Sequence, residues 1–138
     1  MNCPKCVGAL IEITYGETIR LHRCEACAGL FCDPQSLAAM QREYLAEASI
    51  DIGDPSVGRA LDDMDEVCCP RCSIPMEPTY DPEQTHIWYE ICSNCNGIWL
   101  DAGELTDLKY QTLMDRIRGL LRRPSPNRRP QTGSQNSA

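Results

Sequence analysis

Eight of the ten cysteines form two copies of one spacing pattern, and each copy supplies four sulfur ligands. A copy consists of two Cys-x-x-Cys pairs, with 17 residues between the pairs in the first copy and 19 in the second. Each pair places two sulfurs on one tight turn, and two facing turns make the closed tetrahedral cage of structural zinc. We therefore predict two zinc ions, with the ligands Cys3, Cys6, Cys24, Cys27, Cys69, Cys72, Cys92 and Cys95.

Two cysteines and both histidines lie outside these quartets. When the two halves are aligned after the second pair, Cys32 takes the place of Leu100, so we expect a buried, small apolar side chain there. Cys68 adjoins the second quartet, but a ligand pair of Cys68 and Cys72 would have three residues between its members, a spacing that the first quartet lacks. We therefore do not expect Cys68 to be a ligand. His22 and His86 occupy non-equivalent positions, and we expect both on strand surfaces because four sulfurs already close each site.

The cysteine content also suits a disulfide framework, which is typical of small secreted proteins. No basic segment, apolar stretch or cleavage site precedes the first pair, and the longest apolar runs are too short to cross a membrane. We therefore expect a cytoplasmic protein, in which thiols stay reduced and bind metal. Iron in a rubredoxin-like site, with a redox function, is the alternative that uses the same ligands.

Catalysis is not indicated by this pattern. A site closed by four sulfurs leaves no coordination position for a substrate. The sequence shows no glycine-rich phosphate loop and no histidine set beside a nucleophile. We therefore predict a protein that is not an enzyme and has no catalytic residues.

The residues around the first quartet predict a ribbon followed by a helix. Residues 9–15 and 19–23 have strand patterns around a turn at Gly16-Glu17, and residues 28–31 read as a short third strand. Asp33-Pro34 then predicts a helix start, with the aspartate as its cap. The expected apolar stripe of this helix is Leu37, Met40, Tyr44, Leu45 and Ala48.

The second half repeats this plan. Residues 85–91 are rich in β-forming side chains, and residues 97–100 predict the third strand. Asp101 and Glu104 predict a reciprocal capping box at the start of a helix. The apolar stripe of that helix would be Leu105, Leu108, Thr112, Leu113, Ile117 and Leu120.

These patterns predict a small metal-stabilised α+β fold of two tandem zinc ribbons. The expected parts are a first ribbon with its helix (1–49), an acidic linker (50–66), a second ribbon with its helix (67–121) and a disordered tail rich in arginine and proline (122–138). Because neither ribbon can bury a sufficient core, metal must replace it, and we expect each ribbon to fold independently. The linker is expected to be solvated; as the alternative, it contacts a basic partner.

Charge separates the body of the chain from its end. The net charge is −7, but residues 1–115 hold all 20 acidic residues, whereas residues 116–138 hold six arginines and no acid. We expect Lys5 and Arg71, inside equivalent cysteine pairs, to offset the charge of the metal sites.

The acidic body suits nucleic acid poorly, because phosphate contacts dominate that affinity. The leading hypothesis is therefore a zinc module that binds a protein, with no membrane and no small-molecule substrate indicated. Nucleic-acid binding through the ribbon hairpins and the basic tail is the alternative. Its candidate contacts are Arg116, Arg118, Arg122, Arg123, Arg128 and Arg129.

The segment from Cys69 to Leu108 resembles the bacterial zinc-ribbon family named for transcription factor IIB. The resemblance rests on the Cys-Pro-Arg-Cys opening, the Cys-Ser-Asn-Cys return and the stretch Gly-Ile-Trp-Leu-Asp-Ala-Gly-Glu-Leu that ends at Leu105. The first half is similar to a diverged copy, and the resemblance covers roughly residues 1–45 and 67–115. It implies zinc ligands at Cys69, Cys72, Cys92 and Cys95 and a ribbon fold, and it implies a role in transcription less firmly.

Overall fold

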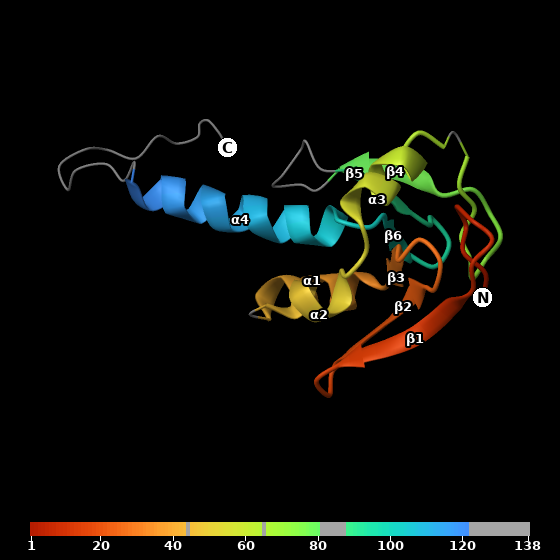
Figure 1. Ribbon diagram of the computed structural model, residues 1–138, viewed down its shortest axis with the longest axis horizontal. Coiled ribbons are helices and arrows are strands. Elements are labelled where there is room, and N and C mark those ends of the chain that lie inside the picture. Colours follow the sequence, from red (N-terminus) through yellow and green to blue (C-terminus); the bar gives the residue numbers. More distant parts are fainter. Residues whose placement is uncertain (44, 65, 81–87, 122–138) are drawn as a thin grey trace.

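The chain folds into two three-stranded ribbons, each followed by a helix, in a computed structural model that describes residues 1–43, 45–64, 66–80 and 88–121 (Figure 1). The first ribbon and its helix are β1 (Leu10–Tyr15), β2 (Ile19–Cys24), β3 (Leu30–Cys32) and α1 (Pro34–Arg42). The second set is β4 (Glu77–Tyr80), β5 (Trp88–Ile91), β6 (Ile98–Leu100) and α4 (Glu104–Leu121). Between them lie α2 (Ala46–Ile50) and α3 (Pro55–Leu61). The predicted fold class is confirmed, and the tail at 122–138 lies outside the described residues.

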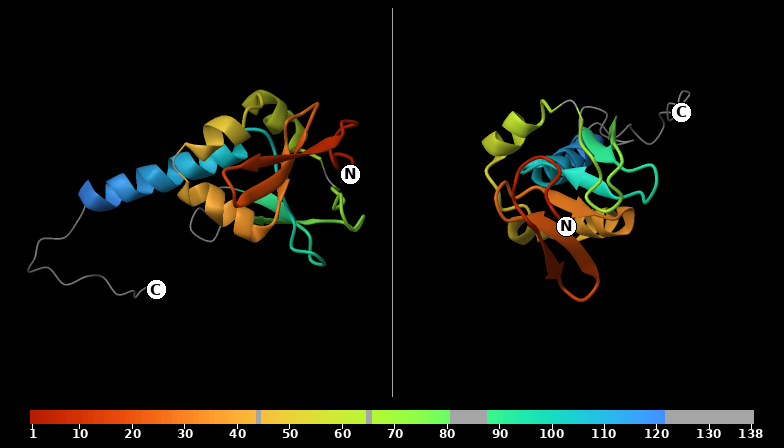
Figure 2. Two further views of the ribbon diagram at one scale, coloured as in Figure 1. Left: turned by 90° about the horizontal axis from the view of Figure 1, so that it is seen from below. Right: turned by 90° about the vertical axis from the view of Figure 1, so that its right-hand side faces the viewer.

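The six strands form one antiparallel sheet in the order β1-β2-β3-β6-β5-β4. Its centre is the pairing of β3 with β6 (Figure 2). In this pair Phe31 lies opposite Trp99. Each ribbon therefore continues the sheet of the other, and the two halves share one apolar core. Independent folding of the two ribbons stays a prediction, and in the intact chain each half buries surface against the other.

The main core lies where α1 and α2 pack on the sheet and α4 packs on α2. Its described members are Ile19, Leu21, Leu30, Cys32, Leu37, Met40, Ala46, Ile50, Tyr89, Ile98, Leu100, Leu105 and Leu108. The expected roles of Leu105 and Leu108 are confirmed, since neither side chain is exposed. The remaining predicted stripe residues of α4 have side chains outside the described set.

The stripe expected for the first helix is only partly right. Leu37 and Met40 are buried, but α1 ends at Arg42. Leu45 then adopts a left-handed φ of 60° and is 52% exposed, so the predicted continuous helix is interrupted. The new helix α2 changes the buried face, which explains why Ala48 is exposed. Tyr44 lies outside the described residues.

The segment at 50–66 contacts the second ribbon and its helix at particular residues. Asp51 is buried, and its carboxylate accepts hydrogen bonds from the amides of Gly103 and Thr106 at 2.9 and 2.8 Å, at the start of α4. The helix α3 packs so closely that a Cβ on Gly58 would lie 2.1 Å from the carbonyl oxygen of Ala102. Most described residues of the segment are exposed, as expected of a solvated linker, including Asp63 in its acidic end, whereas Asp51 and Gly58 are buried.

Replacing Asp51 with alanine is expected to lower the free energy of unfolding by about 2 kcal/mol, because two amides and the Thr106 hydroxyl lose their acceptor. Asp63→Ala is the matched control, since this exposed acid belongs to the same segment. Denaturant unfolding of the zinc-loaded proteins measures both changes. Equal effects of the two substitutions would contradict the capping role of Asp51.

Candidate metal centres

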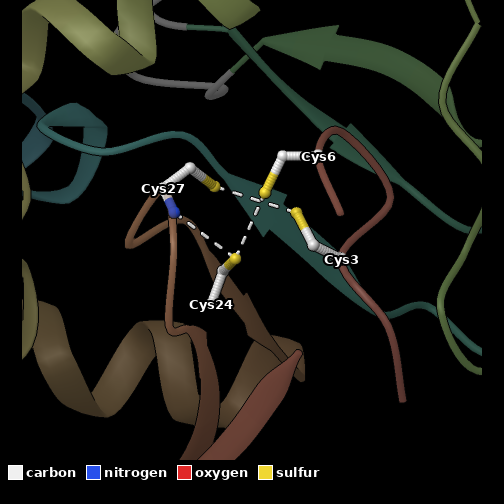
Figure 3. A group of neighbouring side chains, drawn as sticks. All are labelled: Cys3, Cys6, Cys24 and Cys27. Atoms are coloured by element: carbon white, nitrogen blue, oxygen red, sulfur yellow. Dashed lines mark hydrogen bonds between the residues drawn. The ribbon is translucent and has the colours of Figure 1, made fainter. Parts of the chain in front are cut away.

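The first cysteine quartet comes together beside the ends of β1 and β2 (Figure 3). Cys3 and Cys6 lie on the turn before β1, Cys24 ends β2, and Cys27 lies on the turn that leads to β3. The four Sγ atoms point toward one centre and lie within 4.8 Å of one another. The distance is 3.8 Å between the sulfurs of Cys3 and Cys27 and 3.4 Å between those of Cys6 and Cys24.

The second quartet repeats this geometry. Cys69 and Cys72 precede β4, and Cys92 and Cys95 lie between β5 and β6. Their sulfurs also lie within 4.8 Å of one another, with 3.7 Å between Cys69 and Cys95. The structure thus places the eight predicted ligand residues in two groups of four.

The sulfur geometry of both groups fits zinc. Four thiolates at about 2.3 Å from a tetrahedral Zn²⁺ lie about 3.8 Å from one another. The contact with Cys3 lowers the pKa of the Cys27 thiol to about 5 and raises the pKa of Cys3, so two sulfurs compete for one proton. Two thiolates this close would repel each other, and a divalent cation bound between them neutralises their charge. The two sites therefore suit two zinc ions, as predicted.

Backbone amides support the sulfurs in the same way at both sites. The amide of Lys5 donates to Cys3 Sγ, and the equivalent amide of Arg71 donates to Cys69 Sγ, each at 3.3 Å. Such bonds are strengthened when the acceptor carries negative charge. Because they come from the Cys-Pro-x-Cys turns themselves, the local sequence alone orients these donors.

The spare cysteines lie outside both sulfur groups. Cys32 is 2% exposed in the core, and burial raises the pKa of its thiol to about 12, so the predicted apolar role is confirmed. Cys68 is exposed, and its backbone forms an isolated antiparallel β-bridge with Pro75, as the backbone of the equivalent Asn2 does with Ala9. His22 lies on β2, as expected, and belongs to neither group, whereas His86 lies outside the described residues.

The side chains of Lys5 and Arg71 cross to the opposite ribbon. Lys5 Nζ donates to Asp101 Oδ2 at 2.7 Å, and both side chains are almost completely buried. Burial alone would lower the pKa of Lys5, but the bond and charge of Asp101 hold it above its ordinary value. Lys5 therefore neutralises a carboxylate instead of the metal site, which corrects our expectation.

Arg71 makes the equivalent contact at the surface. Its Nη1 donates to Asp33 Oδ1 at 3.3 Å, and the two side chains are 41% and 46% exposed. Its guanidinium also lies 5.0 Å from the centroid of the Phe31 ring. Burial opposes the charge of Arg71, but the hydrogen bond and charge of Asp33 hold its pKa above the ordinary value, and the charge of Cys95 adds to this effect, so part of the expected offset of site charge is retained.

The predicted helix caps use their carboxylates differently. Asp33 lies at the expected N-cap position of α1 but makes no side-chain capping bond. Asp101 binds Lys5 and Trp99, while its amide donates to Glu104 Oε1 at 2.7 Å, which is half of the predicted capping box. The side-chain cap of α4 comes from Asp51, which no local pattern identifies.

Several carboxylates meet beside the buried Lys5. Oxygens of Asp62, Asp101 and Glu104 lie within 4.8 Å of one another, and Glu90 Oε1 lies 3.6 Å from Lys5 Nζ. Burial raises the pKa of Glu104 to about 9. Lys5 supplies a positive charge, and a neutral Glu104 reduces the repulsion that remains, so we interpret this group as structural.

Glu104→Gln is expected to raise stability increasingly as the pH rises toward about 9. The pKa of Glu104 in the folded chain lies above its ordinary value of 4.5, so folding takes up a proton and stability falls between the two values as pH rises. Glutamine keeps the acceptor oxygen and does not ionise. Thermal unfolding of the zinc-loaded proteins between about pH 6 and pH 9 measures this, and equal pH slopes would contradict it.

Only two of the predicted nucleic-acid contacts lie within the described part of the chain. Arg116 and Arg118 lie on α4, and Arg118 is exposed, whereas the arginines at 122, 123, 128 and 129 lie outside the described residues. Tyr89 of the second ribbon hairpin is buried in the core and does not present its ring to a nucleic acid. Trp88 lies on β5, but its side chain is not described.

The family model described as "Transcription factor zinc-finger" matches residues 2–41 and 68–111. These ranges contain both quartets and together cover more than half of the chain. No curated protein and no solved structure shows significant similarity to it. The two matches agree with the two ribbons and their metal geometry, so the chain belongs to the transcription factor zinc-finger family, of which it carries two tandem copies.

Proposed function

We propose that the chain is a non-catalytic module whose zinc sites maintain a surface that binds another protein. Each site takes all four ligands from the chain, which is the closed coordination of structural zinc. The family description suggests transcription as the process, and a cytoplasmic location is part of the proposal. Among the helices that the structure describes, none is both long and apolar enough to span a bilayer.

The observation that carries this proposal is a group of exposed apolar side chains along the contact of α2 with α4. Leu45, Ile52 and Tyr110 are 52%, 58% and 57% exposed, and we call them the α2–α4 surface. Large exposed apolar groups that gather on one face are typical of protein interaction sites.

Two contacts place the segments that carry these residues beside each other. Lys109 of α4 forms an ion pair with Glu47, which lies two residues after Leu45. Thr106 of α4 hydrogen-bonds to Asp51, which directly precedes Ile52. The third, Tyr110, follows Lys109 directly and lies one turn after Thr106 on the same helix face. The helix α4 then continues away from the sheet, beyond α1 and α2 (Figure 1).

The charge of the body favours a particular kind of partner. Exposed carboxylates border the α2–α4 surface at Glu43 and Asp107. A protein with apolar side chains in the centre of its interface and lysine or arginine at the rim would complement both features.

Substitution of the α2–α4 surface tests this function. A protein captured by the zinc-loaded full chain should be purified and its affinity measured by calorimetry. Tyr110→Lys and Ile52→Lys should each weaken binding by at least about tenfold with zinc content unchanged, because they place charge in the apolar centre. Ile11→Lys is the matched control, since Ile11 is 39% exposed on β1. Equal effects of Tyr110→Lys and Ile11→Lys would reject this surface.

The same material tests the nucleic-acid alternative. DNA and RNA titrations should be run with the full chain and with a chain that ends at Leu121. Binding through the tail arginines should disappear on truncation and weaken steeply with salt. Sequence-selective, salt-resistant binding by the truncated chain would replace a protein partner with a nucleic acid.

A further inference from the structure

Phe31 and Trp99 at the centre of the sheet each pack against the opposite ribbon. They face each other across the β3–β6 pair, and neither is exposed. A Cβ on Gly29 would lie 2.2 Å from Trp99 Cζ2, and a Cβ on Gly97 would lie 2.4 Å from Phe31 Cζ. Each ring therefore occupies the space that any side chain on the other ribbon's glycine would need.

These two glycines belong to the metal sites. The amide of Gly29 donates to Cys27 Sγ at 3.5 Å, and the amide of Gly97 donates to Cys95 Sγ at 3.4 Å. In both quartets the acceptor is the last cysteine in the chain. The aromatic ring of one ribbon thus fixes the glycine that hydrogen-bonds to a metal ligand of the other.

A second path joins Trp99 to the first metal site. Trp99 Nε1 donates to Asp101 Oδ1 at 2.9 Å, and Asp101 Oδ2 accepts from Lys5 Nζ at 2.7 Å. The amide of Lys5 in turn donates to Cys3 Sγ. The second ribbon therefore contacts both ends of the first quartet, through Gly29 and through Lys5.

A matching path joins the first ribbon to the second metal site. The guanidinium of Arg71 lies over the Phe31 ring and binds Asp33, while its amide donates to Cys69 Sγ. One apolar cluster consequently contains Phe31, Trp99 and the cysteines of both quartets.

We propose that Phe31 and Trp99 are positioning residues for the metal site of the opposite ribbon and couple the two sites, so that zinc at one site raises the affinity of the other. Metal binding and folding are linked in small ribbons, so a ribbon without metal does not hold its aromatic side chain in place. The opposite site then loses the support of its glycine amide. Linkage requires the effect to be equal in both directions. This inference rests on the metal sites and is independent of the proposed partner.

The consequence is that chains with one metal ion are rare. The protein should pass from the metal-free to the fully loaded form over a narrow range of free zinc concentration. The coupling should change the affinity by about tenfold or more, within the range usual for coupled sites.

Native mass spectrometry of the unsubstituted chain is the first test, with Co²⁺ as the probe. Two independent and equal sites give about half of the chains with one ion at half saturation, and coupling reduces this fraction. We expect clearly less than half of the chains to carry one ion at half saturation. A fraction of half or more would overturn the prediction that chains with one ion are rare.

The second test measures Co²⁺ affinity from the thiolate charge-transfer and d–d absorption. Cys72→Ser/Cys95→Ser disables the second site of the full chain, and we expect the first site to bind about tenfold more weakly or worse. An unchanged affinity would overturn the coupling.

The aromatic residues are then tested by repeating this comparison in other backgrounds. In the Phe31→Leu/Trp99→Leu background, disabling the second site should change the Co²⁺ affinity of the first site by about twofold or less. In the Met40→Ala background, a core truncation away from both sites, the full loss of affinity should remain. If the double variant does not load metal, Trp99→Phe replaces it, because a phenyl ring is too short to reach Gly29 and has no donor for Asp101. Full coupling in the Phe31→Leu/Trp99→Leu variant, or in Trp99→Phe where it replaces that variant, would reject the role of the aromatic residues.

Discussion

Removal of zinc by a chelator is expected to unfold both ribbons and to disrupt the whole six-stranded sheet. The cysteines of both quartets belong to one apolar cluster with Phe31 and Trp99, so loss of the ions removes support from the central strand pair. Structural zinc contributes about 10–16 kcal/mol per site in peptide models, as much as the entire stability of a typical domain. Far-UV circular dichroism and amide NMR spectra should therefore show an unfolded chain, and two equivalents of zinc should restore the native spectra.

Two cysteine substitutions provide the control for this experiment. Cys24→Ser removes a predicted ligand and should abolish the dispersed amide spectrum and reduce the zinc content below two ions per chain. Cys68→Ser changes an exposed cysteine outside both sulfur groups and should retain two ions and the native spectrum. A native-like spectrum of the chelated protein, or stoichiometric iron after expression without added metal, would contradict the assignment of structural zinc.

Lys5→Met is expected to lower the free energy of unfolding by about 3–5 kcal/mol, because it leaves the buried Asp101 and the partly buried Glu90 without their cation. The repeat supplies the matched control. Arg71→Met removes the cation from the equivalent position, where the pair with Asp33 is exposed, and it should change stability by about 1 kcal/mol or less.

Both variants keep the backbone amides that donate to the sulfurs, so both should bind two zinc ions. Denaturant unfolding with excess zinc compares the two stabilities, and elemental analysis verifies the metal content. Similar stability losses for the two substitutions would show that burial of the Lys5–Asp101 pair does not determine its contribution.

The local parts of the fold and of the metal sites could be predicted from the sequence because neighbouring residues determine them. A Cys-x-x-Cys pair makes its own turn, and the alternation at residues 9–15 is close to the observed strand β1. The same holds for the start of α1 at Pro34, where proline fixes the backbone of the first helical residue.

The contacts between the halves could not be predicted in this way. A strand of three residues, such as β3, carries too little alternation to identify its partner, and β6 lies far away in the sequence. Lys5 and Arg71 occupy the same motif position, so no local rule distinguishes the buried residue from the exposed one. One signal was present: Gly29-x-Phe31 and Gly97-x-Trp99 repeat a glycine two residues before an aromatic, which is the unit of the reciprocal packing.

The strand order β1-β2-β3-β6-β5-β4 is equivalent to an isologous dimer of ribbons whose two subunits are joined in one chain. In a true homodimer the two faces are identical, so a ligand that contacts both has two equivalent orientations. Here the symmetry is broken, since α1 has 9 residues and α4 has 18, and one cross-ribbon ion pair is buried while the other is exposed. A molecule that spans both halves therefore binds in a single orientation, with one copy per chain.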